Sequence, residues 1–242
     1  MSCTVTIPGR FNGPPNSGNG GFSCGVLARL VQGPARVRLH VPPPLDAPLQ
    51  IARDEHGGLE MRQGDTLVGS GGPVDYALDI PPAPSLAEAE AAMAGFPCYD
   101  DHMFPTCFVC GPARAAGDGL RLFPGPVGDG PLMACVWRPA ADLLDDSGAV
   151  RAEVVWSALD CPGYFAAMQG VVRPAVLGQL EGEVLHRVPG DQALVVYSWP
   201  LGADGRKFYG ATAIAGADRQ VLASSRSTWI ELRAAQAGER AG

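Results

Sequence analysis

The chain has 242 residues, of which 46% are hydrophobic, and its formal net charge is −7. This length and apolar content allow one large globular unit or two modest domains, and they exclude a chain that stays unfolded. The acidic balance argues against a nucleic-acid partner, because phosphate backbones are bound by basic surfaces. No apolar run approaches the ~20 residues of a membrane span, and no N-terminal secretory signal is recognisable.

The cysteines indicate the compartment. There are seven of them, an odd number, and most lie within apolar segments, as Cys24, Cys135 and Cys161 do. Reduced thiols in a cytoplasmic protein are the simplest explanation of this pattern. Binding to a membrane surface is not expected either, because the sequence contains no basic amphipathic helix.

The first half of the chain predicts one helix followed by antiparallel strands. Residues 1–20 are rich in turn formers, and apolar residues then recur at helical spacing from Gly21 to Val31. The glycines within residues 54–58 predict the turn of a hairpin. Strands are predicted over residues 35–41, 49–53, 59–62, 66–70 and 73–80.

A linker with a short helix separates this half from the next. Ser85 and Glu88 have the spacing of a capping box, which opens an alanine-rich helix that ends at Gly95. The second half predicts a helix over residues 152–169, bent near Asp160 because Pro162 lacks a backbone donor. Its strands are predicted over residues 120–123, 132–138, 180–187, 193–199, 207–215 and 221–232.

The two halves share one order of elements, which predicts a duplicated unit. Each half presents one helix and an antiparallel sheet, and a sheet that wraps around a helix buries it on most sides. This explains why neither predicted helix has a fully polar face. The predicted divisions are an N-terminal domain at 1–82, a linker at 83–106, a C-terminal domain at 107–233 and a disordered tail at 234–242.

Three segments carry a resemblance to a known family. Cys107-Phe-Val-Cys-Gly-Pro112 followed by Gly117-Asp-Gly-Leu120 resembles the opening of many hotdog thioesterase-like domains. The segment 156–163 looks like the central hotdog helix, which in that superfamily often carries an acid, and 17–21 is similar to the glycine-rich entry of such helices. Nearly the whole chain resembles thioesterase-like proteins with two fused hotdogs, which are relatives of the double-hotdog acyl-CoA thioesterases.

The resemblance implies an α+β fold called a tandem, or double, hotdog. Two long central helices would be wrapped by one continuous curved antiparallel sheet, and the ligand would lie between the paired hotdogs. It implies an acyl-CoA or acyl-carrier thioester as the substrate and no cofactor. A homo-oligomer is compatible with it, because such sheets often associate further.

Thioester hydrolysis needs a group that activates water or attacks the carbonyl, and donors that hold the developing oxyanion. The first helix begins with Gly20 and Gly21, whose amides are free at a positive dipole end, but it contains no acid. The second helix contains Asp160. We therefore predict one composite site, with Asp160 as general base or nucleophile and the two glycine amides on the thioester carbonyl. The competing interpretation is a helix-kink aspartate beside ordinary turn glycines.

The remaining candidates are polar residues near the predicted site. Related double-hotdog enzymes add a strand glutamine, and Ser227 stands about where that residue is expected, as a candidate catalytic residue. Phosphates of CoA imply an entrance lined by basic residues. Arg206, Lys207 and Arg226 are the candidate cluster, and Arg36 and Arg38 of the first half are the alternatives. An ordinary polar strand face is the favoured explanation of these polar strand residues. Candidate substrate-binding residues are Asn19, Gln179, Glu181, Arg206, Lys207 and Arg226.

A cysteine-rich segment raises the question of a metal. Cys98, His102, Cys107 and Cys110 lie within a short segment and have the donor types of a tetrahedral zinc site. Similar hotdogs carry the same Cys-Phe-x-Cys-Gly turn without a metal, so we expect no metal and keep structural zinc as the alternative.

Two further functions remain open at this point. One is a non-catalytic hotdog that binds an acyl group or another small ligand. The other is an enoyl-thioester hydratase or dehydratase, which ranks last because all four histidines lie outside the two predicted helices.

Overall fold

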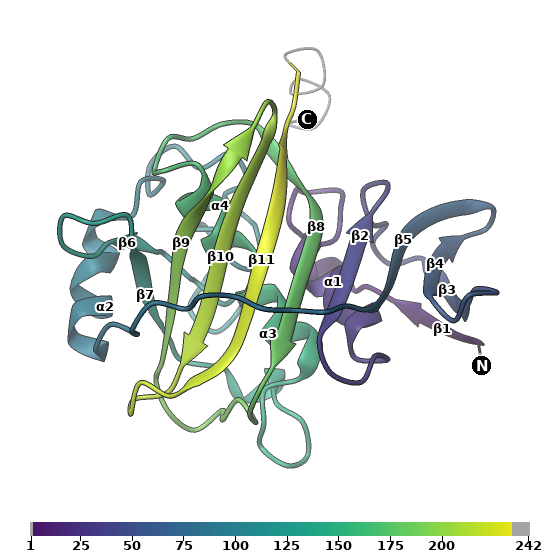
Figure 1. Ribbon diagram of the computed structural model, residues 1–242, viewed down its shortest axis with the longest axis horizontal. Coiled ribbons are helices and arrows are strands. Elements are labelled where there is room, and N and C mark those ends of the chain that lie inside the picture. The colour runs from purple at the N-terminus through teal and green to yellow at the C-terminus, as the bar shows by residue number, and fades with distance from the viewer. Residues whose placement is uncertain (1, 234–242) are drawn as a thin grey trace.

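The computed structural model describes residues 2–233, and within them eleven strands form one continuous antiparallel sheet (Figure 1). The strand order is β1-β3-β4-β5-β2-β8-β11-β10-β9-β7-β6. The strands of the first half are β1 (Ser2–Thr6), β2 (Ala35–Leu39), β3 (Pro48–Arg53), β4 (Leu59–Gln63) and β5 (Thr66–Pro73). Those of the second half are β6 (Gly125–Pro126), β7 (Met133–Trp137), β8 (Ala175–Val184), β9 (Leu194–Asp204), β10 (Lys207–Ala215) and β11 (Val221–Glu231).

The two halves of the chain meet in the middle of this sheet. Strand β2 of the first half pairs with β8 of the second, from Ala35 opposite Gly182 to Arg38 opposite Gln179. All the other strand pairs join two strands of the same half. The halves are therefore fused into one sheet through a single strand junction in the described residues.

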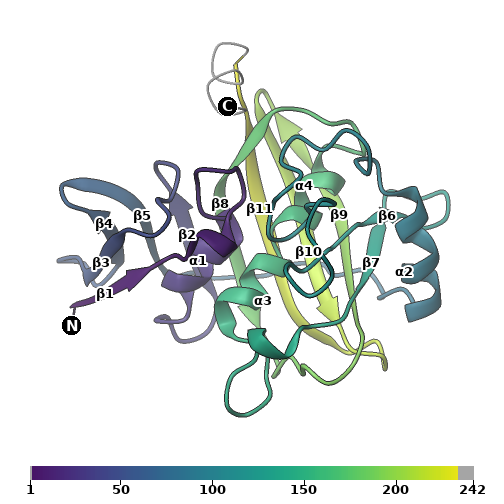
Figure 2. The same ribbon diagram turned by 180° about the vertical axis from the view of Figure 1, so that it is seen from behind.

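Four α-helices occur in this part of the chain: α1 (Gly20–Ala28), α2 (Leu86–Ala92), α3 (Ala152–Ala158) and α4 (Cys161–Ala167). Figure 2 shows α1, α3 and α4 on one face of the sheet. Residues 74–84 cross the opposite face, and α2 lies at its β6–β7 end (Figure 1). Helix α2 begins with the predicted capping box between Ser85 and Glu88. Within residues 2–233, no helix reaches the length and apolarity that a membrane crossing requires.

The central helices are shorter than the resemblance implied. Helix α1 has nine residues, and the second helix is split into α3 and α4, of seven residues each. The split falls at Asp160, where Pro162 was expected to bend the chain. Short helices suffice here because burial against the sheet, and not intrinsic propensity, stabilises them.

Two glycines bring α1 and α3 into close contact. Gly21 and Gly25 lie one turn apart on α1, and a Cβ atom at Gly25 would lie 2.5 Å from the Cα atom of Glu153 and 2.8 Å from the Cβ atom of Trp156. A residue with a side chain at this position would force the helices apart. The packing therefore depends on glycine at positions where a helix normally disfavours it.

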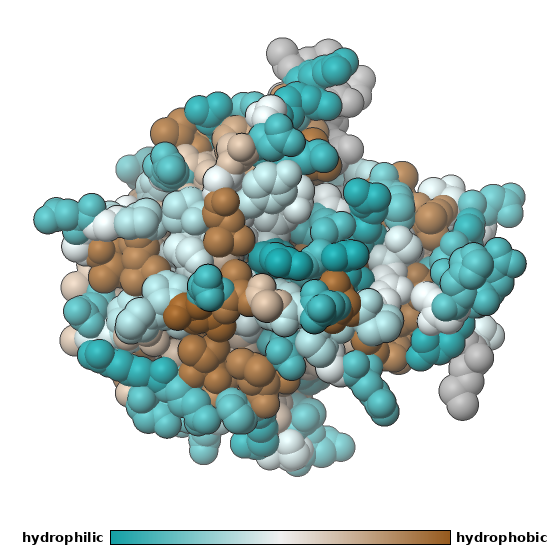
Figure 3. All heavy atoms as spheres, in the orientation of Figure 1, coloured by the Kyte–Doolittle hydropathy of each residue, from teal (hydrophilic) through white to brown (hydrophobic). Residues whose placement is uncertain are grey.

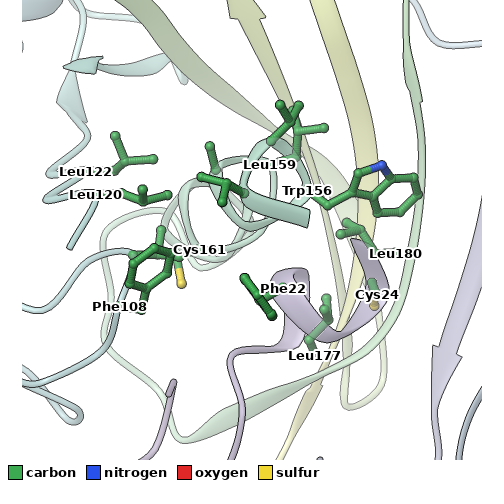
Figure 4. Packing of buried hydrophobic residues seen from close by; sticks show 14 of the residues in the cluster. Phe22, Cys24, Phe108, Leu120, Leu122, Trp156, Leu159, Cys161, Leu177 and Leu180 are labelled. Carbon is green, nitrogen blue, oxygen red and sulfur yellow. The ribbon is translucent and has the colours of Figure 1, made fainter. Parts of the chain in front are cut away.

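The hydrophobic core has two layers, one on each face of the sheet. The larger layer lies between the helices and the inner face, where Phe22, Trp156 and Leu180 pack together (Figure 4). The smaller layer lies on the outer face, where α2 and the preceding segment cover Tyr197 and its neighbours. The Tyr197 hydroxyl donates a hydrogen bond to the carbonyl oxygen of Pro81 at 3.2 Å. Figure 3 shows this outer face, with hydrophilic residues near its centre between hydrophobic patches.

Most predicted strands are confirmed. The alternation in residues 35–41 corresponds to β2, in which Val37 is buried and Arg36 is exposed. The predicted hairpin around 54–58 is formed by β3 and β4. The predicted strands at 66–70, 132–138, 180–187, 193–199, 207–215 and 221–232 correspond to β5, β7, β8, β9, β10 and β11.

Two predicted strands do not form, and two observed strands, β1 and β6, were not predicted. No strand forms at 73–80, because β5 ends at Pro73 and the chain then crosses over the sheet instead of pairing with its edge. None forms at 120–123 either, since Arg121 has a left-handed backbone (φ 52°) that interrupts an extended segment. Strand β1, which pairs with β3, was missed within the turn-rich residues 1–20. The predicted disordered tail at 234–242 lies outside the described residues.

The glycine contact between α1 and α3 can be tested by Gly25→Ala. We expect the free energy of unfolding to fall by roughly 1–3 kcal/mol, because overpacking against a helix backbone outweighs the ~1 kcal/mol by which alanine favours a helix. Gly130→Ala is the matched control, since a Cβ atom there would meet nothing within 4 Å. Urea unfolding of both variants is the measurement, and equal stabilities would contradict the packing argument.

Candidate active site

Asp160 lies at the break between α3 and α4. Its backbone (φ −92°, ψ −83°) is non-helical, and Pro162 occupies the first turn of α4 without donating a hydrogen bond. The Ser225 hydroxyl donates to the freed Leu159 carbonyl oxygen at 2.9 Å, and the Gly163 amide donates to the Asp160 carbonyl oxygen at 3.0 Å. The break is thus held in place by specific hydrogen bonds.

The Asp160 carboxylate contacts the start of α1, which belongs to the other half of the chain. Its Oδ2 atom accepts hydrogen bonds from the Gly21 amide at 2.8 Å and from the Asn19 side-chain amide at 3.1 Å. Its Oδ1 atom is buried and has no hydrogen-bond partner among the described residues. One carboxylate oxygen is therefore fixed, and the other is left for a further partner.

Asn19 orients both participants. Its side-chain oxygen caps α1 by accepting a hydrogen bond from the Phe22 amide at 2.9 Å, and its side-chain nitrogen donates to Asp160. The capping interaction fixes the asparagine rotamer, and this in turn directs the NH₂ group at the carboxylate. The same nitrogen lies 3.8 Å from the sulfur of Cys161.

Burial raises the pKa of Asp160 to about 7, because an ionised carboxylate loses its hydration there. The hydrogen bond from the Gly21 amide lowers this pKa, the neighbouring Cys107 sulfur raises it, and the Asn19 amide lowers it. The balance leaves a substantial fraction of the group charged at neutral pH, as a general base requires.

Gly21 is required by this contact, and Gly20 beside it is closely packed. A Cβ atom at Gly21 would lie 2.5 Å from the Cβ atom of Asp160 and 2.5 Å from the Trp156 carbonyl oxygen. A Cβ atom at Gly20 would lie 2.8 Å from the side chain of Leu177. The Gly20 amide, unlike that of Gly21, has no hydrogen-bond acceptor within residues 2–233. It is therefore the backbone donor available to a ligand.

A cavity of about 250 Å³ joins these groups. Asn19, Gly20 and Asp160 line it, and so do residues from both halves of the chain. It reaches the surface beside Val172 and Arg173, which are exposed. Most of its wall is apolar, as in the pockets that hold acyl groups, and includes Phe104, Tyr164, Phe165, Leu177, Trp229 and Ile230.

Ser227 lies outside this cavity wall. It is buried on β11, where its hydroxyl donates to the Gly210 carbonyl oxygen at 3.1 Å and accepts from the Trp229 indole at 2.9 Å. Both hydrogen bonds are structural. The neighbouring Trp229, which sequence reasoning missed, does line the cavity.

Gln179, Glu181 and Arg226 lie on the opposite face of the sheet. The guanidinium carbon of Arg226 lies 5.7 Å from the ring centre of Tyr76. Tyr76 belongs to the segment that crosses the outer face, so Arg226 lies on that face as well. Glu181 forms ion pairs with Arg226 and Arg36, and the Gln179 amide donates to it at 2.9 Å. Gln179 and Glu181 are two residues apart on β8 and so share a face, and Arg226 lies directly opposite Glu181 on β11. The sheet therefore separates all three from Asp160.

One of the predicted basic residues is linked to the cavity wall through an acidic neighbour. Arg206 is in the turn between β9 and β10, Lys207 is the first residue of β10, and the Arg206 guanidinium donates to the Glu231 carbonyl oxygen at 3.1 Å. The Glu231 side chain in turn pairs with Arg173 at 3.5 Å. Arg173 is a second residue that sequence reasoning missed, because it lies in the connection between α4 and β8, where no pattern marks it.

The cysteines gather differently from the predicted zinc set. The sulfur atoms of Cys107, Cys110 and Cys161 all lie within 4.8 Å of one another. Cys98 and His102 line the cavity but do not belong to this group. Thiol hydrogen bonds from Cys110 and Cys161 lower the pKa of Cys107. The sequence contained no signal for Cys161, which is 51 positions beyond Cys110.

His102 presents a hydrogen-bond donor in the cavity wall. Its Nδ1 atom accepts a hydrogen bond from the Phe104 amide at 3.0 Å, which places the ring proton of the neutral form on Nε2. Nε2 is buried and has no partner among the described residues. Burial also lowers the pKa of His102.

Comparisons of the sequence with family models and with curated proteins gave no match. Solved structures do share the fold. An acyl-CoA thioesterase II, TesB2, from Mycobacterium marinum aligns with a TM-score of 0.61 at 10% identity and covers 97% of this chain and 94% of its own. A tesB protein from Mycobacterium avium subspecies paratuberculosis aligns with a TM-score of 0.61 at 14% identity, over 96% and 93% of the two chains.

A third solved structure names the fold. It is a conserved protein of unknown function with a hotdog fold from Alicyclobacillus acidocaldarius, and it aligns with a TM-score of 0.57 at 12% identity over 96% of this chain and 93% of its own. The chain therefore has the hotdog fold. The solved structures that it resembles over nearly its whole length include TesB-like thioesterases.

The hydrogen bond from Asn19 to Asp160 can be tested by Asn19→Asp. The variant keeps the oxygen that caps α1 but replaces the NH₂ donor with a second carboxylate oxygen. We expect the free energy of unfolding at neutral pH to fall by roughly 1–3 kcal/mol. Asn16→Asp, at an exposed position, is the control, and thermal or urea unfolding gives the comparison. An equally small change in both variants would show that the contact contributes nothing.

Proposed function

We propose that the chain is a thioesterase of acyl-CoA or acyl-carrier thioesters, with one composite active site between two fused hotdog units. The observation that carries this proposal is the contact of the Asp160 carboxylate with the start of α1, inside an apolar cavity. The carboxylate comes from one half of the chain and the glycine amides from the other. The likeness to TesB-like structures supports the same activity.

The division into two units follows the predicted boundaries, with residues 1–82 and 107–233 as the hotdogs and 83–106 as the linker. Each unit has its own helix against its own strands, and β2 and β8 join the sheets. The site would exist once, because α1 contains no acid and α3 begins at Ala152 without a glycine pair. At the start of α3, where a second site would lie, Glu153 forms ion pairs with Arg29 and Arg151 instead.

In the proposed reaction, Asp160 acts through its unpaired Oδ1 atom. This oxygen takes a proton from a water molecule as the water oxygen attacks the thioester carbonyl carbon. The Gly20 amide donates to the carbonyl oxygen and stabilises the negative charge that develops on it. The carbon–sulfur bond then breaks, and the thiolate leaves and takes up a proton. The Gly21 amide positions the carboxylate, so only one of the two predicted amides polarises the substrate.

A direct attack of Asp160 on the carbonyl carbon is the alternative route. It would use the same free oxygen and form an anhydride that water then hydrolyses. A single turnover in ¹⁸O-labelled water separates the two routes. If water attacks the substrate, the label enters the acid product in the first turnover. If Asp160 attacks the substrate and water then attacks the Asp160 carbonyl of the anhydride, the label first enters Asp160.

The cavity fits the two ends of such a substrate. Its apolar wall suits an acyl chain, and the basic residues at its mouth suit the phosphates of CoA or of a carrier's phosphopantetheine. Arg173 lines the cavity, and in this proposal Arg206 and Lys207 extend the basic surface beside it. A cytoplasmic location agrees with this substrate and with seven cysteines that form no disulfide.

Asp160→Asn is the decisive variant for this proposal. We expect kcat/KM for acyl-CoA hydrolysis to fall about 100- to 10,000-fold, because the amide cannot accept the proton of water. The control is Asp146→Asn, which removes an exposed carboxylate of the same type. Release of free CoA, followed with a thiol reagent, is the measurement. Undiminished hydrolysis in Asp160→Asn would rule out this mechanism.

Arg173→Gln tests the proposed binding of phosphate at the mouth. We expect KM for acyl-CoA to rise roughly three- to tenfold, as for the loss of one charge-assisted hydrogen bond that solvent partly screens. KM for an acyl-pantetheine without phosphates should stay unchanged in the same variant. Arg138→Gln, an exposed arginine paired with Glu90, is the control. A parallel rise for both substrates would indicate that Arg173 acts on the cavity and not on phosphate.

A non-catalytic hotdog that binds acyl ligands is the second candidate. It is favoured by the engagement of the Gly21 amide with Asp160 and of Ser227 with Gly210, which leaves few donors for a transition state. The two functions differ in outcome. A binder raises its unfolding temperature with acyl-CoA but releases no thiol, whereas a thioesterase does both.

A further inference from the structure

A cluster of three cysteines stands apart from the proposed chemistry. Cys107 and Cys110 come from the loop that follows the linker, and Cys161 is the first residue of α4. All three are buried, and their sulfur atoms lie within 4.8 Å of one another. The proposed hydrolysis uses none of them, so their convergence requires its own explanation.

The spacing of the sulfurs is that of metal ligands. A tetrahedral zinc ion with bonds of about 2.3 Å holds its sulfur ligands about 3.8 Å apart. The Cys107 and Cys161 sulfurs are 3.9 Å apart, and the remaining separations are at most 4.8 Å. A disulfide would need a separation of about 2.05 Å. Shifts of the sulfur atoms by up to about an ångström would bring all three separations to the value expected around zinc.

One hydrogen-bond donor outside the cluster lies beside it. The Asn19 side-chain amide lies 3.8 Å from the Cys161 sulfur. An N–H group in this place is the kind of outer partner that stabilises a metal-bound thiolate.

The other candidate ligands fit less well. His102 donates from Nε2, because the Phe104 amide occupies Nδ1, so the ring would have to turn over before it could coordinate a metal. Cys98 lies elsewhere in the cavity wall and is not part of the sulfur group. All three clustered cysteines line the cavity as well, so a water molecule can supply the fourth ligand from it.

We propose that Cys107, Cys110 and Cys161 bind one thiophilic cation of the Zn²⁺ type, with the fourth coordination position open to the cavity. Bound in this way, the cation joins the loop of Cys107 and Cys110 to the start of α4. Because Cys161 directly follows Asp160, this link would fix the helix break that presents the carboxylate. This site differs from the zinc ligands that the sequence suggested. That set contained Cys98 and His102 and lacked Cys161.

The test is the metal content of the full-length protein. Purified under reducing conditions, equilibrated with Zn²⁺ and dialysed, it should retain one Zn²⁺ per chain. Cys161→Ala and Cys110→Ala should each lower the affinity at least about tenfold. Cys98→Ala and Cys135→Ala should retain the metal, because Cys135 is a buried cysteine of β7 outside the cluster.

A second measurement uses the wild-type protein alone, so it does not depend on the folding of variants. Co²⁺ should produce the charge-transfer absorption of cobalt–thiolate bonds, and Zn²⁺ should abolish it and protect three thiols from alkylation. Absence of metal retention and of this absorption would overturn the proposal. Loss of metal in Cys98→Ala but not in Cys161→Ala would overturn the ligand assignment. Neither readout involves hydrolysis, so each is independent of the proposed activity.

Discussion

The hydrogen bond between the Gly21 amide and the Asp160 carboxylate is the contact on which the site depends. It joins the start of α1 in one half of the chain to the break between α3 and α4 in the other. The carboxylate alone would be an expensive buried charge, and the helix start alone would leave unpaired amides. Together they satisfy each other in part, and what remains unpaired on each side is available to a ligand.

This contact constrains the residues around it. Glycine is required at 21 because a side chain there would collide with the backbone of α3, and a side chain at 20 would have to displace Leu177. Asn19 is required to cap α1 and to donate to the carboxylate at the same time. Pro162 keeps α3 and α4 from joining, so Asp160 can turn toward the other half. A small number of local choices therefore fixes a site between segments about 140 positions apart in sequence.

The sequence predicted this architecture well where the signals were local. Helical spacing located α1, strand alternation located β2, and the capping box located α2. The resemblance to paired hotdogs implied that a carboxylate of one half faces the helix start of the other, and only one helix carries an acid while only the other begins with glycines. The face of each polar strand residue could not be inferred in the same way. Gln179, Glu181 and Arg226 were grouped with the site, yet an ion-pair network holds them on the outer face.

Long-range convergence set the limit of sequence reasoning. Cys161 joins Cys107 and Cys110 only because the helix break brings it there, and Arg173 reaches the cavity mouth through a connection without periodic pattern. The segment at 73–80 had the composition of a strand, but its course over the sheet depends on where β5 ends and α2 begins. Such positions follow from the assembled fold and not from any short stretch of residues.

The most direct test of the central claim is a crystal structure with a non-hydrolysable thioether analogue of an acyl-CoA that keeps the carbonyl group. We predict that the carbonyl oxygen lies within hydrogen-bond distance of the Gly20 amide, with a water molecule between the carbonyl carbon and Asp160 Oδ1. An analogue whose carbonyl lies away from both groups, or on the outer face of the sheet, would contradict the account.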